Sequence, residues 1–210
     1  MNELAKRTLA GVVMIAVALV AAVIGGTWFA LLVAVAAATM FCEWIRIVRG
    51  WGLHWLVAGF GYALIPALAL LWIRERGAHK LDLLLWVFIV TWSTDIGAYF
   101  AGRSIGGPKL APAISPNKTW AGLIGGMVAA GLFGGAWVFS LHLPRLLFAL
   151  APLFAIGAQA GDLFESWLKR RAGVKDSGTI LPGHGGVLDR LDGLVVVASL
   201  TALAQLAEWL

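Results

Sequence analysis

Long apolar runs, separated from one another by short polar segments, make up most of this 210-residue chain. Seven runs are predicted to be helices, over about residues 8–24, 28–47, 53–73, 81–101, 120–141, 146–167 and 191–210. Each is close to the roughly 20 residues that an α-helix needs to cross a hydrocarbon core of about 30 Å. The pattern therefore predicts an all-α, polytopic integral membrane protein with about seven transmembrane helices.

Glycines refine this picture at two places. Gly25-Gly26 predicts a tight turn between the first two helices, although a basic leader ahead of an apolar run is also the pattern of a cleaved signal peptide. The fifth run carries four glycines at four-residue spacings, Gly122 with Gly126 and Gly131 with Gly135. Small residues at this spacing predict close helix packing, with a substrate groove against the helix as the alternative.

Composition supports a membrane protein. Hydrophobic residues are 60% of the chain and charged residues only 13%, whereas a soluble domain would have about half apolar and a quarter charged residues. The single cysteine, Cys42, excludes an intrachain disulfide. The net charge of +5 comes from basic residues between apolar runs, which favours topology signals and phosphate ligands, and we expect no nucleic-acid partner.

The distribution of Lys and Arg predicts the orientation in the membrane. With the N-terminus in the cytoplasm, twelve of the 16 basic residues lie inside: Lys6, Arg7, Arg46, Arg49, Arg103, Lys109, Lys118, Lys169, Arg170, Arg171, Lys175 and Arg190. Four lie outside: Arg74, Arg76, Lys80 and Arg145. By the positive-inside rule, the N-terminus and the polar segments around residues 102–119 and 162–192 are predicted to be cytoplasmic. The basic loop 74–80 is the exception to this assignment.

The segment 162–192 concentrates chemistry in an otherwise apolar chain. Its aspartates are Asp162, Asp176, Asp189 and Asp192, and its cations are Lys169, Arg170, Arg171, Lys175 and Arg190. Carboxylates are the oxygen ligands that Mg²⁺ uses together with substrate phosphates, and Lys and Arg bind phosphate oxygens. Gly183, Gly185 and Gly186 allow backbone N–H groups to approach an anion closely. Together they predict a metal-assisted site for a polyphosphate.

Two spacings in this segment leave a structural alternative open. Asp162, Ser166 and Lys169 recur at i, i+4 and i+7 and so share one helix face, where they either bind ligand or form an anchoring Asp162–Lys169 network. Asp189 and Asp192 stand at the start of the last helix, where acids commonly cap the helix. The preceding glycines favour an anion site, in which a carboxylate would meet phosphate through a cation.

A second polar block surrounds Asp95, an acid near the end of the fourth run. An ionisable residue inside an apolar span indicates a functional site by default, and pairing with Arg103 or Lys118 is the structural alternative. Residues 115–119, SPNKT, predict a turn into the fifth helix, with Asn117 or Thr119 as the cap.

Both blocks resemble the phosphatidate cytidylyltransferase (CDP-diacylglycerol synthase) family. The similar residues are SWLKR at 166–170, Lys175-Asp176, and LPGHGGVLDRLD at 181–192, together with STDIGAYFAGRSIGG at 93–107 and KLAPAISPNKTWAG at 109–122. The resemblance implies transfer of a cytidylyl group from CTP to phosphatidic acid, giving CDP-diacylglycerol and pyrophosphate. It also implies Mg²⁺, with a second cation as an alternative, a homodimer, a bacterial cytoplasmic membrane, and a chain one or two spans longer than this one.

Roles follow from the motif positions. The resemblance implies that Asp162 and Asp189 bind metal. The predicted catalytic residues are Asp162, Lys169, Asp189 and His184. Three roles are open for His184: a phosphate ligand, a proton donor to a leaving group, or a structural hydrogen-bonding residue between glycines. The expected substrate-binding residues are Asp95, Arg103, Lys109, Ser115, Lys118, Ser166, Arg170, Lys175, Asp176, Gly185, Gly186, Arg190 and Asp192. Residues 1–90 are expected to be N-terminal membrane helices, and 91–210 the catalytic part of a single membrane domain.

Two other functions are compatible with parts of the sequence. A CTP-dependent lipid kinase would use similar ligands but attack the γ-phosphorus of CTP. A transporter or non-catalytic membrane scaffold would explain the apolar runs and Asp95, but not the long polar segment with its GHGG sequence.

Overall fold

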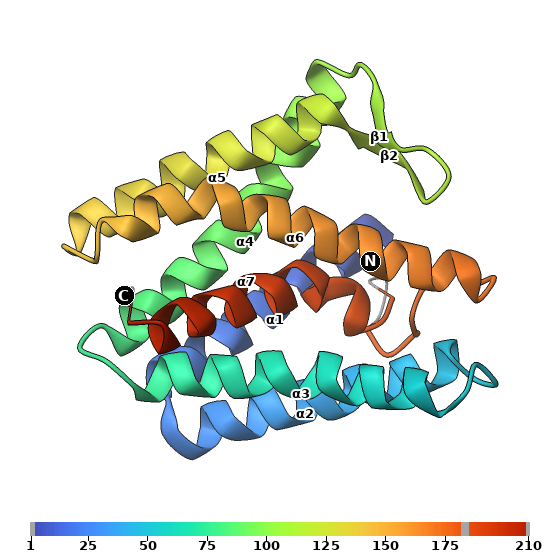
Figure 1. The fold of residues 1–210 in the computed structure, drawn as a ribbon, viewed down its shortest axis with the longest axis horizontal. Helices are drawn as coiled ribbons and strands as arrows, with labels where there is room; N and C mark the ends of the chain where they lie inside the picture. The colour runs from blue at the N-terminus through green and yellow to red at the C-terminus, as the bar shows by residue number, and fades with distance from the viewer. Residues whose placement is uncertain (1–2, 182–184, 209–210) are drawn as a thin grey trace.

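Seven helices and one short β-hairpin form the part of the chain that the computed structural model describes, residues 3–181 and 185–208, with side chains from residue 8 onward (Figure 1). The helices are α1 (Glu3–Ile24), α2 (Gly26–Ile47), α3 (Leu53–Glu75), α4 (Lys80–Ser104), α5 (Trp120–Ser140), α6 (Leu146–Arg171) and α7 (Leu188–Leu206). The strands are β1 (Lys109–Ala111) and β2 (Ser115–Thr119). The predicted all-α architecture is confirmed, and α6 continues into the basic residues that end the sixth apolar run.

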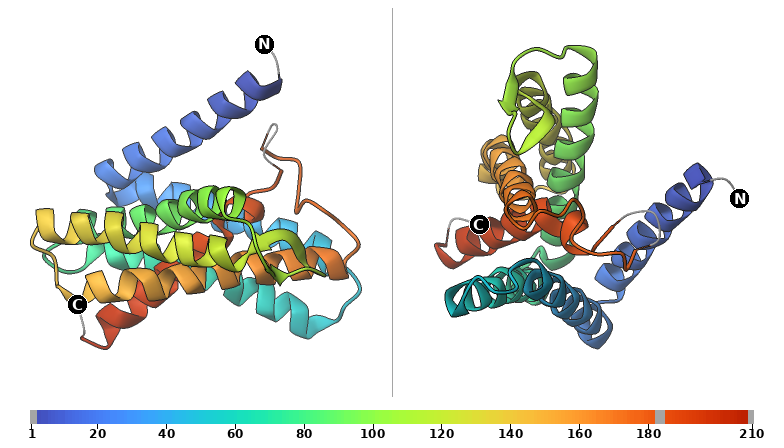
Figure 2. Two further views of the ribbon diagram at one scale, coloured as in Figure 1. Left: turned by 90° about the horizontal axis from the view of Figure 1, so that it is seen from above. Right: turned by 90° about the vertical axis from the view of Figure 1, so that its right-hand side faces the viewer.

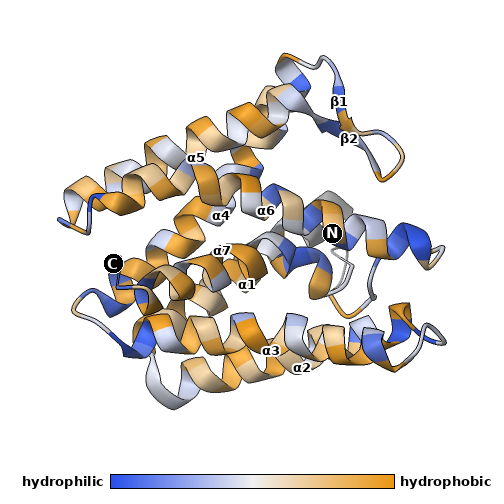
Figure 3. Cartoon of the chain, in the orientation of Figure 1, coloured by the Kyte–Doolittle hydropathy of each residue, from blue (hydrophilic) through white to orange (hydrophobic). Residues whose placement is uncertain are grey.

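Five helices, α2 to α6, are long and apolar enough to cross a membrane. The apolar part of α1, Thr8–Ile24, is shorter. Helix α7 carries three charges in its first five residues, Asp189, Arg190 and Asp192, so it has no uncharged stretch of comparable length. Polar residues gather where α6 ends and α7 begins, beside the hairpin and the α2–α3 connection (Figure 3).

Helices α4 and α5 pack at backbone distance because both carry glycines at their contact. A Cβ on Gly97 of α4 would lie 2.6 Å from the carbonyl oxygen of Gly125, and a Cβ on Gly126 would lie 2.9 Å from that of Thr94. Farther along α5, a Cβ on Gly135 would lie 2.5 Å from the Phe148 ring of α6. The predicted close packing is confirmed at Gly126 and Gly135, and at Gly122, where a Cβ would lie 3.0 Å from the Ala98 carbonyl oxygen, whereas a Cβ on Gly131 would lie at an ordinary 3.9 Å from Pro152. Helix α4 also contributes the fully buried Trp86, so it forms the centre of the core.

Helix α1 leaves the bundle at an angle, whereas α2 and α3 lie side by side (Figures 1 and 2). The predicted turn between α1 and α2 is confirmed at Gly25, whose φ of 68° suits glycine. Arg74 of α3 donates from Nε to the carbonyl of Ala22 at 2.7 Å and from Nη2 to that of Val23 at 3.2 Å. Arg74 belongs to the basic loop that did not fit the positive-inside rule. Its side chain binds carbonyl groups at the C-terminus of α1.

The segment before α5 is a β-hairpin, not the turn that the sequence predicts. Strands β1 and β2 are antiparallel, with Lys109 opposite Thr119 and Ala111 opposite Ser115. The actual turn lies between the strands. Thr119 ends β2 and caps α5, because its Oγ1 accepts the Gly122 N–H at 3.0 Å. The capping prediction for Thr119 is confirmed, and the hairpin fixes the position of the neighbouring Lys118.

Candidate active site

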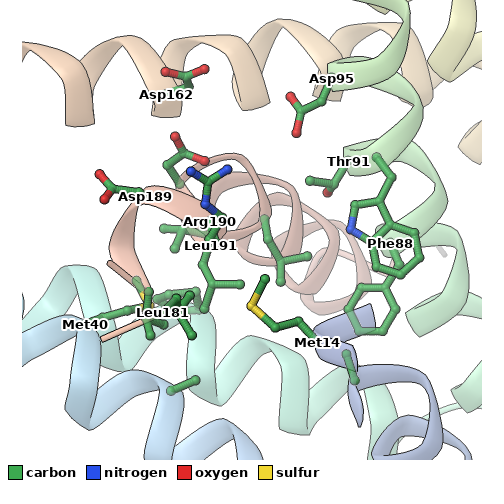
Figure 4. A pocket seen from close by; sticks show the side chains of 18 of the residues that line it. Met14, Met40, Phe88, Thr91, Asp95, Asp162, Leu181, Asp189, Arg190 and Leu191 are labelled. Atoms are coloured by element: carbon green, nitrogen blue, oxygen red, sulfur yellow. The ribbon is translucent and has the colours of Figure 1, made fainter. Parts of the chain in front are cut away.

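A cavity of about 1020 Å³ opens between the helices, with lining residues from all seven of them, from β2 and from the segment before α7. One side is apolar and includes Met14, Val33, Ala67, Phe88 and Trp92. The other side is polar, and it is lined by Asp95, Ser115, Asn117, Lys118, Gln159, Asp162, Asp189, Arg190 and Asp192. Figure 4 shows Asp95, Asp162, Asp189 and Arg190 on one side, with Met14, Met40 and Leu181 on the other. The cavity is therefore amphipathic.

The two polar blocks of the sequence meet in this cavity through an ion pair. Lys118 Nζ lies 2.6 Å from Asp162 Oδ2 and donates to Gln159 Oε1 at 2.9 Å. Ser166 donates to the other Asp162 oxygen at 3.3 Å. Lys118 thus pairs with Asp162 of α6. The structural alternative for Asp95, an ion pair with Lys118, is not the arrangement found. Asp95 is accessible from the cavity.

Lys169 joins α6 to α7 through two carboxylates. Its Nζ lies 2.7 Å from Glu165 Oε2 and 2.7 Å from Asp189 Oδ1. The alternative network, in which Lys169 would pair with Asp162 two turns earlier on the same helix face, is therefore not the arrangement found. Only 11% of the Lys169 side chain is exposed, so one ammonium group neutralises two largely buried acids. The sequence predicted no role for Glu165. Its position four residues before Lys169, a spacing at which side chains on a helix meet, could have indicated this ion pair.

Asp189 is held from three directions. Besides Lys169, it accepts the backbone N–H of Gly186 at 2.8 Å and that of Ser177 at 3.0 Å. These three donors, one of them a cation, compensate the Asp189 carboxylate for the water that it loses. Asp189 lies in the first turn of α7, as the structural alternative predicted for one of the two acids, but neither acid is the N-cap: that residue is Val187, and it makes no side-chain capping bond.

The N-terminus of α7, predicted to bind a substrate anion, binds a carboxylate of the protein. Glu43 of α2 accepts the N–H groups of Val187 at 3.0 Å and Leu188 at 2.8 Å. The sequence predicted no role for Glu43. The available signal was the same as for Asp95, an acid inside an apolar run. This helix end is therefore occupied, which corrects the expectation that it faces phosphate.

The remaining predicted residues fall into three groups. Some lie on the surface outside the cavity lining: Arg103, Lys109, Lys175 and Asp176. Arg170 is also exposed and donates to backbone carbonyls, those of Ile114 and Val174, both at 3.4 Å. Gly185 and Gly186 lie behind Asp189: the Gly186 N–H is already bonded, and a Cβ on Gly185 would lie 2.7 Å from Asp189 Oδ2. His184 lies outside the described residues.

The donor chemistry of the cavity suits a hard cation that is completed by a ligand. Asp162 of α6 and Asp192 of α7 both line the cavity, so carboxyl groups from two helices face the same space. Within residues 3–181 and 185–208, no group of three or more His, Cys, Asp and Glu side chains gathers closely enough to hold a metal alone. Mg²⁺ typically needs only one or two protein carboxylates when substrate phosphates supply the other oxygens. Asp162 has the larger remaining acceptor capacity, since Asp189 already accepts three donors.

Fold and cavity together define a class: a multi-pass membrane protein whose large internal cavity is apolar on one side and lined with carboxylates and cations on the other. The chain belongs to the cytidylyltransferase family, because the sequence model of that family matches residues 49–206.

Curated relatives agree with this assignment. A phosphatidate cytidylyltransferase of Brucella suis biovar 1 (strain 1330) is 51% identical over 168 residues, covering 76% of this chain and 60% of the relative. One from Rickettsia typhi (strain ATCC VR-144 / Wilmington) is 37% identical over 203 residues, covering 91% of this chain and 87% of the relative. One from Rickettsia bellii (strain RML369-C) is 35% identical over 206 residues, covering 94% and 88%. The chain thus spans about 60% of the length of the Brucella relative.

Proposed function

We propose that this protein transfers the cytidylyl group of CTP to phosphatidic acid, producing CDP-diacylglycerol and pyrophosphate. The observation that carries the proposal is the amphipathic cavity of about 1020 Å³. A diacylglycerol lipid needs an apolar compartment, and two phosphorylated substrates need cations next to it. The names of the relatives, phosphatidate cytidylyltransferases, support the same reaction.

The reaction is a displacement at phosphorus. A phosphate oxygen of phosphatidic acid attacks the α-phosphorus of CTP, and the bond from that phosphorus to the oxygen that bridges it to the β-phosphorus breaks. The electron pair leaves with pyrophosphate. The attacking oxygen is already anionic, so the main obstacle is the repulsion between two phosphates. Catalysis of this kind depends on positioning and on charge stabilisation.

The chain's own residues supply these two functions. Lys118 and Arg190 line the polar side of the cavity and would bind phosphate oxygens. Lys118 is held by Asp162 and Gln159, so its ammonium group is already oriented. Lys169 lies behind this surface and fixes Asp189, which makes it a residue that organises the site through another side chain.

We propose Mg²⁺ as the cofactor, with Asp162 as its main protein ligand and Asp189 as the second ligand that the family resemblance implies. When bound, Mg²⁺ would neutralise charge on the triphosphate and polarise the α-phosphoryl group. Asp162 would exchange part of its contact with Lys118 for the metal, which leaves Lys118 available to a substrate phosphate.

We also propose that α1 and α7 cross the membrane together with α2 to α6, that the polar side of the cavity faces the cytoplasm, and that the protein forms a homodimer. The excess of Lys and Arg at this end supports the orientation. An aromatic cluster lies at the same end: the Arg171 guanidinium carbon is 4.7 Å from the ring centre of Trp51, 5.2 Å from that of Trp55 and 5.5 Å from that of Trp167. Trp and Arg in contact are typical of the membrane–water interface.

The reaction is tested with purified protein in detergent, phosphatidic acid and CTP labelled in either the α- or the γ-phosphate. We expect α-label in the lipid product and γ-label in pyrophosphate. Lipid that carries γ-label instead would identify a kinase, and binding of CTP without turnover would favour a non-catalytic protein.

The role of Asp189 gives a second test. Replacement by Asn removes the negative charge that pairs with Lys169, and we expect Mg²⁺-dependent turnover to be lost. An Asp189→Asn protein that is correctly folded and retains full turnover would contradict the proposed site.

A further inference from the structure

Glu43 connects the second helix to the polar segment before α7, more than 130 positions later in the chain. It is fully buried, with 0% of its surface exposed. Its Oε2 accepts the Ser177 hydroxyl at 3.0 Å and the Leu188 N–H at 2.8 Å, and its Oε1 accepts the Val187 N–H at 3.0 Å. Three donors from one segment of the chain therefore converge on a single carboxylate.

A buried carboxylate is costly unless donors replace the water that it loses. The partial positive charge at the N-terminus of α7 adds a favourable electrostatic interaction with Glu43. Removing this carboxylate would leave two backbone N–H groups and one hydroxyl without their acceptor, and the segment would have to rearrange to satisfy them. The arrangement thus ties Ser177, Val187 and Leu188 to α2.

Two glycines make room for this carboxylate. A Cβ on Gly186 would lie 2.5 Å from Glu43 Oε2, and a Cβ on Gly178 would lie 2.6 Å from Glu43 Oε1. Any side chain at either position would therefore displace Glu43. The sequence suggested that Gly186 contacts phosphate. In the structure, glycine fits at this position because Glu43 occupies the space that a side chain would fill.

The same segment leads directly into residues that line the polar side of the cavity. Ser177 gives its hydroxyl to Glu43 and its backbone N–H to Asp189. Leu188, held by Glu43, directly precedes Asp189 and Arg190, which line the cavity. Glu43 itself does not line the cavity, so any effect on a bound substrate must pass through these neighbours.

We propose that Glu43 is a positioning residue for the transfer reaction, which sets the orientation of Asp189 and Arg190 by binding the N-terminus of α7 and Ser177. This proposal rests on the proposed cytidylyl transfer. It adds a residue that precedes the family match, which begins at residue 49. Glu43 acts through its neighbours and touches no substrate.

The test compares Glu43→Gln and Glu43→Ala with Glu75→Gln, a matched control at an exposed acid on α3. Glutamine keeps the shape but turns one acceptor atom into a donor that faces other donors, whereas alanine removes all three acceptances. We expect kcat to fall about 10- to 100-fold, as for partners that orient active-site ligands, with alanine more severe than glutamine. The KM for phosphatidic acid should stay within about twofold, because the apolar side of the cavity is unchanged.

Hydrogen exchange of the backbone, measured on the same proteins, separates positioning from general stability and does not require turnover. We expect faster exchange confined to residues 177–190 in the Glu43 variants, and no change in Glu75→Gln. Unchanged kcat per folded molecule would overturn the proposal, and so would faster exchange spread evenly over the chain. If Glu43→Ala does not fold, Ser177→Ala removes a single hydroxyl donor, and we expect a smaller loss of kcat in the same direction.

Failure of the proposed function is distinguishable from failure of this inference. A wild-type protein without cytidylyl transfer refutes the function, whereas the exchange pattern still decides whether Glu43 orders residues 177–190. If the wild-type protein is active and the Glu43 variants match it in kcat and in hydrogen exchange, only the positioning role is refuted.

Discussion

Replacing Lys169 with methionine should destabilise the protein more than any other single change of charge at the site. The Lys169 ammonium lies 2.7 Å from both Glu165 Oε2 and Asp189 Oδ1, and the Glu165 and Asp189 side chains are only 2% and 6% exposed. Methionine keeps much of the volume and removes the cation. Two acids, both largely excluded from water, would then lack their shared partner.

Breaking one buried ion pair in this way costs about 3–5 kcal/mol. For a chain of this length, 1 kcal/mol corresponds to roughly 2–4 °C in Tm, so we expect Tm to fall by about 6–20 °C. The measurement is thermal unfolding in detergent, followed by tryptophan fluorescence. Lys80→Met, at the exposed start of α4, is the control and should leave Tm nearly unchanged.

A second substitution tests the reason for the effect. Glu165→Gln removes one of the two acids that share the ammonium group, so the Lys169→Met/Glu165→Gln protein should recover part of the lost stability. A Lys169→Met protein whose Tm equals that of Lys80→Met would show that the ammonium group does not hold the two helices together. A double variant less stable than Lys169→Met alone would refute the electrostatic explanation.

Three further predictions concern other contacts. Lys118→Met should lower turnover about 10- to 100-fold, measured as labelled lipid formed per minute, because Asp162 loses the partner that orients it; unchanged turnover would exclude Lys118 from the site. Gly125→Val should lower Tm by overpacking the α4–α5 contact at Gly97, at a cost of roughly 1–3 kcal/mol, and an unchanged Tm would contradict that contact. Arg74→Gln should speed hydrogen exchange near the C-terminus of α1; protection equal to wild type would show that another group binds those carbonyls.

The sequence was sufficient to predict the helices, because apolar runs of about the right length for a membrane span have few other solutions. It also identified Asp162, Lys169 and Asp189, since ionisable groups beside apolar runs need partners. Their pairing was not predictable from spacing. Asp162 and Lys169 share a helix face in the sequence pattern, yet Lys118 reaches Asp162 and Lys169 reaches Glu165 and Asp189.

Contacts between distant parts of the chain account for the other differences. The bond between Glu43 and Leu188 joins residues 145 positions apart, and periodicity within one helix contains no information about such a partner. The segment SPNKT was predicted as a turn because of its local composition, whereas pairing with Lys109–Ala111 makes it a strand. Tertiary pairing decided its conformation, as is common for strands.

The central claim is that the polar side of the cavity carries out cytidylyl transfer. The most direct test is the Mg²⁺-dependent formation of α-labelled lipid by wild-type protein and by Asp162→Asn, side by side, with Asp82→Asn, which changes an acid in the first turn of α4, as the control. We expect labelled CDP-diacylglycerol from wild type and Asp82→Asn, and almost none from Asp162→Asn. Equal formation of labelled lipid by all three folded proteins would contradict the account.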